Sequence, residues 1–200
     1  SGSISLIDYD GQKYSYRCTS LPMGPLSLKA YHLNLNFINQ LSEGARKHIQ
    51  IRTFPFGAWE KEQRYIDDFG LNIISQDTLA NTISSSRLVI CTYPQTTFSE
   101  AMYSGVPTMI LYDEKFWEVQ PIYKELVQLL KVSGIMYTDE ILAAQHVDSI
   151  VNDPMEWWNN PKTVFARKKF NELCLTIDPN PLDSWVELFR SISKEGSVKR

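Results

Sequence analysis

Cysteine and histidine are scarce in this chain of 200 residues, with three of each. The cysteines, Cys18, Cys91 and Cys174, are widely spaced and form no Cys-x-x-Cys pair, which favours buried thiols in a reducing compartment over disulfides. The histidines are equally scattered, so their spacing offers no set of metal ligands. We expect neither a disulfide framework nor a metal ion or other cofactor.

An excess of charge and a long apolar run are also missing. The 20 Lys and Arg against 23 Asp and Glu give a formal net charge of −3, whereas nucleic-acid binders are usually strongly basic. No apolar run approaches the ~18–20 residues of a membrane-spanning helix, and the N-terminus lacks the layout of a signal peptide. The sequence predicts a cytoplasmic protein that binds no nucleic acid. With 43% hydrophobic residues it can form the core of about one domain.

Two groups of catalytic motif are absent. The sequence has no glycine-rich loop of the Walker or dinucleotide-binding type and no Gly-x-Ser-x-Gly elbow. These absences make P-loop enzymes, dehydrogenases and α/β-hydrolases poor candidates.

Apolar segments alternate with helical ones through most of the chain. The expected strands are residues 48–54, 71–74, 87–92 and 107–112, with an edge strand at 134–137. The expected helices are residues 26–41, 59–69, 77–85, 96–103, 117–132, 138–152, 161–175 and 181–193. Strands that are apolar throughout and separated by helices indicate a parallel sheet covered on both faces. The predicted fold is therefore α/β, a Rossmann-like doubly wound sheet flanked by helices, with a C-terminal helical segment.

Both ends of the chain are expected to differ from this domain. Asp10-Gly11 lies between two alternating apolar runs, a strong signal for a β-hairpin. We expect residues 1–25 to form a hairpin or connecting segment, residues 26–193 the Rossmann-like domain, and residues 194–200 a flexible tail.

The turn after the expected strand 87–92 has the clearest potential for ligand binding. Gln95, Thr96 and Thr97 open a helix there, which places two hydroxyls and several backbone N–H groups at a positive helix end. A phosphate fits such a site without any lysine, and Glu100, one turn later, can accept hydrogen bonds from sugar hydroxyls. The alternative is purely structural, with Thr96 as an N-cap and Glu100 as a carboxylate that the helix dipole favours.

Other loops at the same edge of the sheet carry further polar residues. Arg52, near the end of its strand, can pair with a phosphate or form a surface ion pair. Asp77 is expected to be an N-cap and Gln76 a loop residue. The neighbouring acids Asp113 and Glu114 are typical of a solvated first turn and are assigned no catalytic role.

Residues 87–113, RLVICTYPQTTFSEAMYSGVPTMILYD, resemble the nucleotide-sugar-binding half of GT-B glycosyltransferases. Further similarity connects the chain to bacterial surface-carbohydrate transferases related to the Kdo and sialic acid transferases, which use CMP-activated donors. The segments that carry it are Ile51-Arg52-Thr53-Phe54-Pro55 followed by Gly57, Trp59 and Arg64, then Gln95-Thr96-Thr97, Phe116-Trp117-Glu118 and Trp157-Trp158. Phe54 stands where those enzymes have the histidine of a His-Pro pair, which leaves the donor open.

The resemblance implies a set of donor-binding residues in this chain and a catalytic base in another domain. The implied nucleotide- and phosphate-binding residues are Gln95, Thr96, Thr97, Arg52 and Pro55, and the implied ribose, sugar or base contacts are Glu100, Gln76 and Asp77. The acceptor-side base of a GT-B enzyme belongs to an N-terminal domain, so no catalytic residue is assigned in this chain. The implied partners are a nucleotide sugar, a glycan acceptor and that N-terminal domain. The implied place of the reaction is the inner face of the membrane.

The expected activity is transfer of a sugar from a nucleotide-activated donor, such as a CMP-linked one, to a bacterial surface polysaccharide or other glycan. Two alternatives remain open at this point. A polyol-phosphate transferase of the teichoic-acid type has the same sheet and threonine-rich turn. A non-catalytic binding module can be built on the same fold.

Overall fold

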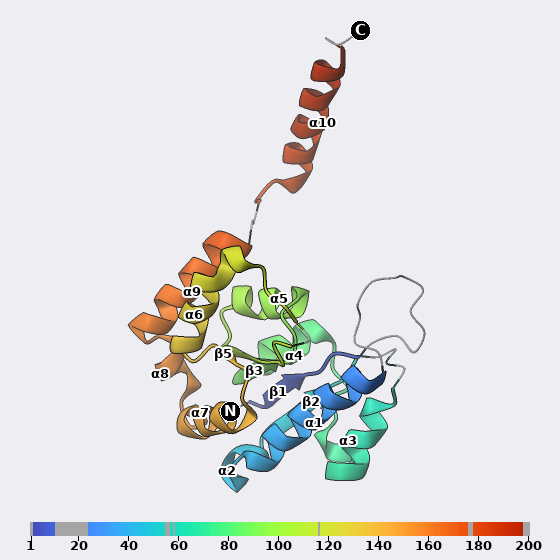
Figure 1. The fold of residues 1–200 in the computed structure, drawn as a ribbon, viewed down its shortest axis with the longest axis vertical. Coiled ribbons are helices and arrows are strands. Elements are labelled where there is room, and N and C mark those ends of the chain that lie inside the picture. Colours follow the sequence, from blue (N-terminus) through green and yellow to red (C-terminus); the bar gives the residue numbers. More distant parts are fainter. Residues whose placement is uncertain are drawn as a thin grey trace.

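The computed structural model describes residues 2–10, 24–54, 57, 59–115, 117–175 and 178–197. Its centre is a five-stranded parallel sheet with strand order β2-β1-β3-β4-β5 (Figure 1). The strands are β1 (Ile4–Ile7), β2 (Ile49–Arg52), β3 (Leu88–Cys91), β4 (Thr108–Leu111) and β5 (Met136–Tyr137). The predicted α/β doubly wound fold is confirmed.

Helices cover both faces of this sheet. The α-helices are α1 (Gly24–Gln40), α2 (Glu43–Arg46), α3 (Lys61–Phe69), α4 (Leu79–Ser85), α5 (Thr96–Ser104), α6 (Lys124–Val132), α7 (Glu140–Ile150), α8 (Pro154–Trp158), α9 (Pro161–Cys174) and α10 (Pro181–Ser197), and the 3-10 helices are η1 (Leu71–Ile73) and η2 (Pro121–Tyr123). One buried cluster joins the sheet to α1, α2, α3 and α7, and a second joins it to α4, α5, α6, α8 and α9.

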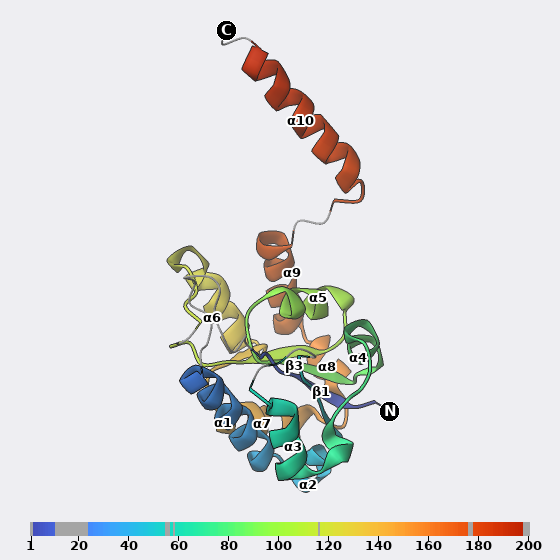
Figure 2. The ribbon, with the colours of Figure 1, turned by 90° about the vertical axis from the view of Figure 1, so that its right-hand side faces the viewer.

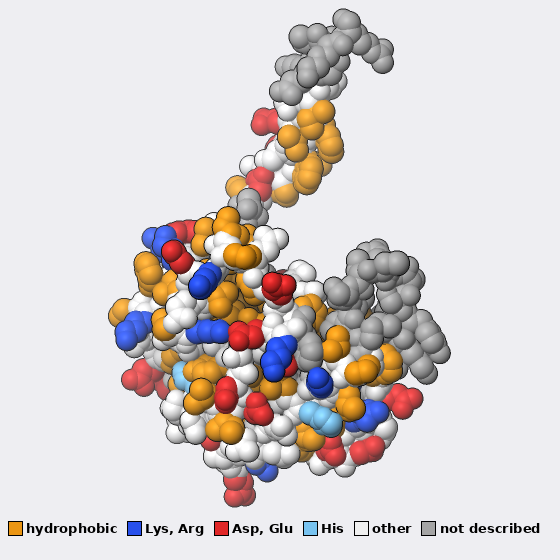
Figure 3. Space-filling view, viewed as in Figure 1, with side chains coloured by type: hydrophobic (Ala, Val, Ile, Leu, Met, Phe, Trp, Pro, Cys, Tyr) orange, Lys and Arg blue, Asp and Glu red, His pale blue; other side chains and the backbone are white. Residues whose placement is uncertain are grey.

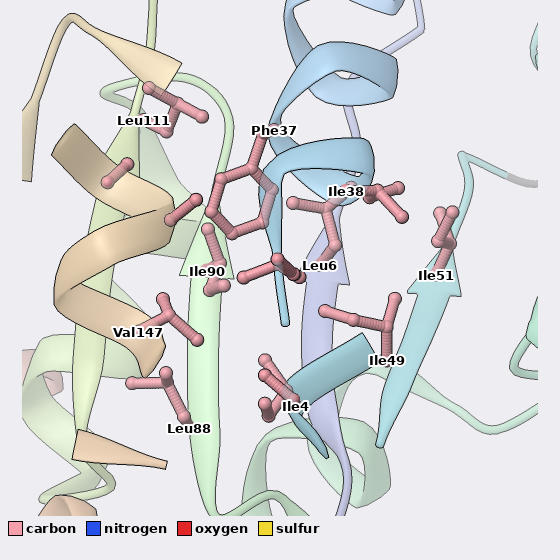
Figure 4. Close-up of a cluster of buried hydrophobic side chains, with 14 of the residues drawn as sticks. Ile4, Leu6, Phe37, Ile38, Ile49, Ile51, Leu88, Ile90, Leu111 and Val147 are labelled. Atoms are coloured by element: carbon pink, nitrogen blue, oxygen red, sulfur yellow. The ribbon is translucent and has the colours of Figure 1, made fainter. Parts of the chain in front are cut away.

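The core on the first face is made by large aliphatic and aromatic side chains. Phe37 and Ile38 of α1 meet Leu6 and Ile90 of the central strands, with Val147 of α7 beside them (Figure 4). All five side chains are fully buried. Burying such a side chain contributes about 1.5–3 kcal/mol, so this layer holds α1 and α7 on the sheet and fixes where the loops at its edges emerge.

The pairing of β1 contradicts the hairpin expected in residues 1–25. Ile4 pairs in parallel with Ile49 of β2 on one side and with Leu88 of β3 on the other, so both edges of β1 are already occupied. Its four residues are all buried, as is usual for a strand in the middle of a parallel sheet. Residues 4–7 therefore belong to the centre of the domain rather than to a separate segment. The expected second arm of the hairpin lies outside the described residues.

Several predicted boundaries also change. Residues 71–73 form the 3-10 helix η1, and only Ile74 makes an isolated parallel bridge to Ile51. The N-cap of α4 is Thr78, whose hydroxyl accepts from the Asn81 amide, so the assignment of Asp77 as that cap is wrong. α5 ends at Gly105 as expected, with Gly105 at a φ of 79°, a conformation that favours glycine.

α10 extends away from the rest of the molecule (Figures 1 and 2). Its apolar side chains are exposed, and Figure 3 shows them gathered on one side of the helix. They are Leu182, Trp185, Val186, Leu188, Phe189 and Ile192. The helix continues to Ser197, into the segment expected to be a flexible tail. Among the described residues no helix is long and apolar enough to cross a membrane.

Candidate functional site

The strand order places a topological switch point between β1 and β3. From β1 the chain crosses to β2 on one side, and from β3 to β4 on the other. Ligands of open α/β sheets bind in the crevice outside the carboxyl ends of the strands at such a point. Two segments leave the sheet here, residues 8–10 after β1 and residues 92–95 after β3. The candidate site is built around them.

The N-terminus of α5 lies directly after β3. The amides of Phe98 and Ser99 donate to the Gln95 carbonyl, at 3.0 and 3.3 Å. The amides of Thr96 and Thr97 precede these in the first turn, and neither finds an acceptor within the described chain. They are the N–H groups available to an anion at this positive helix end.

The two threonines of this turn have different surroundings. Thr96 is exposed, as are Gln95 and Glu100, so all three side chains can reach a ligand. Thr97 is buried, and its hydroxyl is hydrogen bonded to the Tyr93 hydroxyl at 2.9 Å. Thr96 is therefore the hydroxyl that can contact a phosphate directly, whereas Thr97 anchors Tyr93.

Arg52 and Asp77 meet at the end of β2. The Arg52 Nε donates to the backbone carbonyl of Asp77 at 3.3 Å, and the Ser75 amide donates to the Ile51 carbonyl at 2.8 Å. These bonds tie the loop after η1 to β2 and leave the side chains of Gln76 and Asp77 exposed. Pro55, the remaining expected site residue, lies outside the described residues.

β1 lies between these two groups of expected site residues. Neighbouring strands are ~4.8 Å apart, so the carboxyl ends of β2 and β3 are about 10 Å from each other. The segment Asp8-Tyr9-Asp10 leaves the sheet in the gap. A ligand that contacts both Arg52 and Thr96 must therefore pass over this segment.

A buried ion pair holds the start of that segment. Lys61 Nζ lies 3.1 Å from Asp8 Oδ2 and also donates to the Tyr9 carbonyl at 2.6 Å. The Asp8 carboxylate further accepts hydrogen bonds from Asn34 Nδ2 and the Tyr65 hydroxyl, each at 3.0 Å. The network connects α1, α3 and β1, and it fixes the backbone from which Tyr9 projects.

The rings of Tyr9, Tyr93 and Trp117 pack together near the carboxyl ends of β1 and β3. Tyr9 lies 4.9 Å from Tyr93 and 5.6 Å from Trp117 between ring centroids. Burial raises the pKa of the Tyr93 hydroxyl, although its hydrogen bond with Thr97 acts in the opposite direction. Burial also raises the pKa of Tyr9. Both tyrosines are therefore neutral near pH 7, and the rings form an uncharged wall beside the N-terminus of α5.

A largely apolar cavity of about 470 Å³ opens beside this wall. It is lined by residues of α5, α6 and α9 and of the segments before α5 and α6, among them Gln95, Phe98, Trp117, Leu126 and Phe170. The volume is within the range of roughly 300–1,000 Å³ typical of pockets for small molecules. The cavity therefore adjoins the N-terminus of α5, because Gln95 and Phe98 line it.

Within the described residues, no group of three or more His, Cys, Asp or Glu side chains is arranged to hold a metal ion.

The network around Asp8 is the part of the site that sequence reasoning missed. Its members stand at positions 8, 34, 61 and 65, which share no motif. The hairpin signal also led us to assign residues 4–10 to a segment outside the sheet domain. The signal that could have located it is the apolar run Ile4–Ile7 followed by Asp8, a buried strand that ends in a carboxylate.

A family model described as LIC12162 family transferase matches residues 1–189. The chain belongs to this transferase family. The match includes β1, the rest of the sheet domain and residues 181–189 of α10. No curated protein matches the chain. The α5 turn, the aromatic wall and the Asp8 network are therefore features of a transferase.

Proposed function

We propose that this chain binds the nucleotide-activated sugar of a glycosyltransferase, with the donor phosphate at the N-terminus of α5. The observation that carries the proposal is the exposed Gln95-Thr96 turn, with its unused amides, at the switch point of a transferase. Helix N-termini bind phosphate through such amides. In this proposal the donor phosphate is bound by these donors and by Arg52 rather than by a basic cluster.

The other proposed contacts with the donor are assigned from the side chains at the carboxyl ends of the strands. The aromatic wall of Tyr9, Tyr93 and Trp117 offers faces on which a base or sugar ring can pack. Glu100 is exposed one turn into α5 and accepts from sugar hydroxyls. Gln76 and Asp77 are exposed beside Arg52 and are assigned to the ribose or base.

In this proposal the chain stabilises the leaving group of the transfer reaction. As the bond to the anomeric carbon breaks, negative charge develops on the donor phosphate, and the α5 amides, the Thr96 hydroxyl and Arg52 stabilise it. Deprotonation of the acceptor hydroxyl is assigned to a residue outside this chain, in the N-terminal domain that the resemblance to GT-B enzymes implies. A CMP-linked sugar and a bacterial surface glycan are the donor and acceptor that this resemblance favours.

Calorimetric titration of the chain with CMP, CDP, UDP and GDP tests the proposal. We expect at least one nucleotide to bind and Thr96→Ala to raise its Kd by about ten- to a hundredfold, because a hydrogen bond to a charged group contributes roughly 1.5–3 kcal/mol. Ser149→Ala, on the exposed side of α7, is the matched control. Absence of heat with all four nucleotides would instead favour a non-catalytic module, and turnover of CDP-glycerol would indicate a polyol-phosphate transferase.

A further inference from the structure

The cavity of about 470 Å³ beside α5 adjoins the proposed phosphate site. Gln95 belongs to both, because it directly precedes the first turn of α5 and also lines the cavity. In a nucleotide-activated donor the sugar is bonded directly to a phosphate. A phosphate at the N-terminus of α5 therefore brings the attached sugar within reach of this cavity, whose volume is in the range that holds small molecules.

The accessible apolar part of the lining comes from aromatic rings and aliphatic side chains. Trp117 and Tyr123 are half-buried, so each ring keeps part of its surface open to a ligand. Val127 of α6 is also half-buried, and Leu173 of α9 is exposed. Such surfaces favour contact with the C–H face of a sugar ring or with a methyl substituent on it.

The same cavity is also lined by polar side chains, namely Gln95, Ser99, Glu118 and Gln120. All are exposed except Ser99, which is half-buried, so none of them is sealed in the core. Within the described residues, none of these side chains has a hydrogen-bond partner. Two amides, a hydroxyl and a carboxylate supply both donors and acceptors, as the hydroxyl and acetamido groups of a sugar require.

The charge of the lining is negative. Glu118 is the only Asp, Glu, Lys or Arg among the described residues that line this cavity. Lys115 and Lys124 lie on either side of it in the sequence, and neither lines the cavity. A carboxylate on a bound sugar would therefore lie among apolar side chains and a like charge, without a cation to offset its loss of water. The lining disfavours an acidic sugar.

We infer that this cavity binds the sugar of the donor and selects an uncharged sugar with an apolar substituent, such as the methyl of an acetamido group. This assignment rests on the proposed function for the position of the phosphate. It separates the donor of this chain from Kdo and sialic acid, because both of those sugars carry a carboxylate. Trp117 and Tyr123 contact the ring or its methyl group, and Gln95 and Gln120 contact its hydrogen-bonding groups.

Protection of Cys174 from iodoacetamide tests the sugar site without a nucleotide, because Cys174 is exposed and lines the cavity. Mass spectrometry of the peptide that contains Cys174 gives its alkylation rate in the full chain. The ligands are the methyl glycosides of glucose, N-acetylglucosamine and glucuronic acid, and the last two each differ from the glucoside at one position. Relative to the glucoside, we expect the N-acetylglucosaminide to bind about fourfold more tightly, through one more buried methyl group, and the glucuronide at least about tenfold more weakly.

Variants of the lining show whether the ligand occupies the cavity. Glu118→Gln should raise the affinity for the glucuronide at least about threefold, because it removes a like charge, and should leave that for the glucoside unchanged. Glu125→Gln, at an exposed position of α6 outside the lining, is its control. Val127→Phe should fill the cavity and remove protection by every glycoside. Val132→Phe, at the exposed end of α6, should retain it.

The outcomes separate the sugar site from the phosphate site, which the calorimetric titration with nucleotides tests. If a nucleotide binds but no glycoside protects Cys174, the sugar site is wrong and the phosphate site stands. If the glycosides protect Cys174 and no nucleotide binds, the reverse holds. Protection by the glucuronide equal to that by the N-acetylglucosaminide would overturn the selectivity. Equal effects of Val127→Phe and Val132→Phe would overturn the cavity as the place of binding.

Discussion

Asp8 and Lys61 carry opposite charges out of water, with side-chain exposures of 2% and 3%. A buried carboxylate is tolerated when a cation and hydrogen-bond donors surround it, and here Lys61, Asn34 and Tyr65 do so. Burial, assisted by the charge of Asp8, raises the pKa of Tyr65 well above its ordinary value, so this phenol stays a donor to Asp8 at any ordinary pH. The pair therefore stabilises the segment that leads to Tyr9 only while both charges are present.

Lys61→Met is expected to lower the free energy of unfolding by about 3–5 kcal/mol, because it leaves the Asp8 carboxylate buried without its cation. Urea unfolding followed by circular dichroism measures the change. Lys169→Met is the control, since Lys169 pairs with Glu172 at the surface and its removal should cost less than about 1 kcal/mol. Equal losses in the two variants would contradict the role assigned to the buried pair.

His146 makes stability depend on pH. Its ring packs 5.5 Å from Tyr137 and 4.9 Å from Trp157 between centroids, and burial lowers its pKa below the ordinary 6.5. Below pH 6.5 the unfolded chain takes up this proton before the folded protein does, so stability falls as the pH falls from 6.5 toward the folded pKa.

His146→Phe should reduce that loss of stability without abolishing it, because burial, Arg87 and Lys47 also lower the pKa of His48. Denaturant midpoints of both proteins between pH 8 and pH 5 provide the measurement. The two profiles should run parallel above pH 7.5 and separate below pH 6.5. Parallel profiles throughout would show that His146 is not responsible.

At the scale of elements, the continuous apolar runs predicted β3 and β4 within about one residue at each end. β1 was mispredicted because Asp10-Gly11 carries a strong local turn signal, whereas the partners of β1 are 45 and 84 residues away, at Ile49 and Leu88. Local sequence cannot weigh a turn signal against pairings at that distance. The short helices α2 and α8 were missed because four and five residues are too few to show helical periodicity.

The start of α4 provides a prediction at this scale. Thr78→Ala should lower stability by about 0.5–2 kcal/mol, because the Thr78 hydroxyl accepts from the Asn81 amide at 3.2 Å. Asp77→Ala should change it by less than about 0.5 kcal/mol, since Asp77 contacts Arg52 and Ser75 through its backbone alone. Chemical denaturation of the two variants compares neighbouring residues directly. A larger loss in Asp77→Ala would restore Asp77 as the cap.

At the scale of the whole molecule, the sheet order determines which residues can act together. The sequence predicted the Thr96 turn correctly as a helix start, and it placed Arg52 and Asp77 at one edge, where they do meet. It could not reveal that β1 separates these groups, nor that Gln95 and Cys174 line one cavity, because both facts depend on the order of strands and on the packing of α5 against α9. Site assembly is therefore a property of topology more than of any motif.

α10 allows the independence of the sheet domain to be measured. All its described side chains are exposed, and it extends away from the sheet in both ribbon views, so it contributes little buried area to the remainder (Figures 1 and 2). A chain ending at residue 179 should therefore unfold in urea at the same midpoint as the full chain. A midpoint lowered by more than about 1 M urea, equivalent to roughly 1–3 kcal/mol, would show that α10 packs on the domain in solution.

The same shortened chain should self-associate less than the full chain, because Trp185 and Phe189 belong to an exposed apolar face of the kind that promotes association. Sedimentation velocity at several concentrations measures this effect. Ser184→Ala, at a polar position on the same helix, is the control in the full chain.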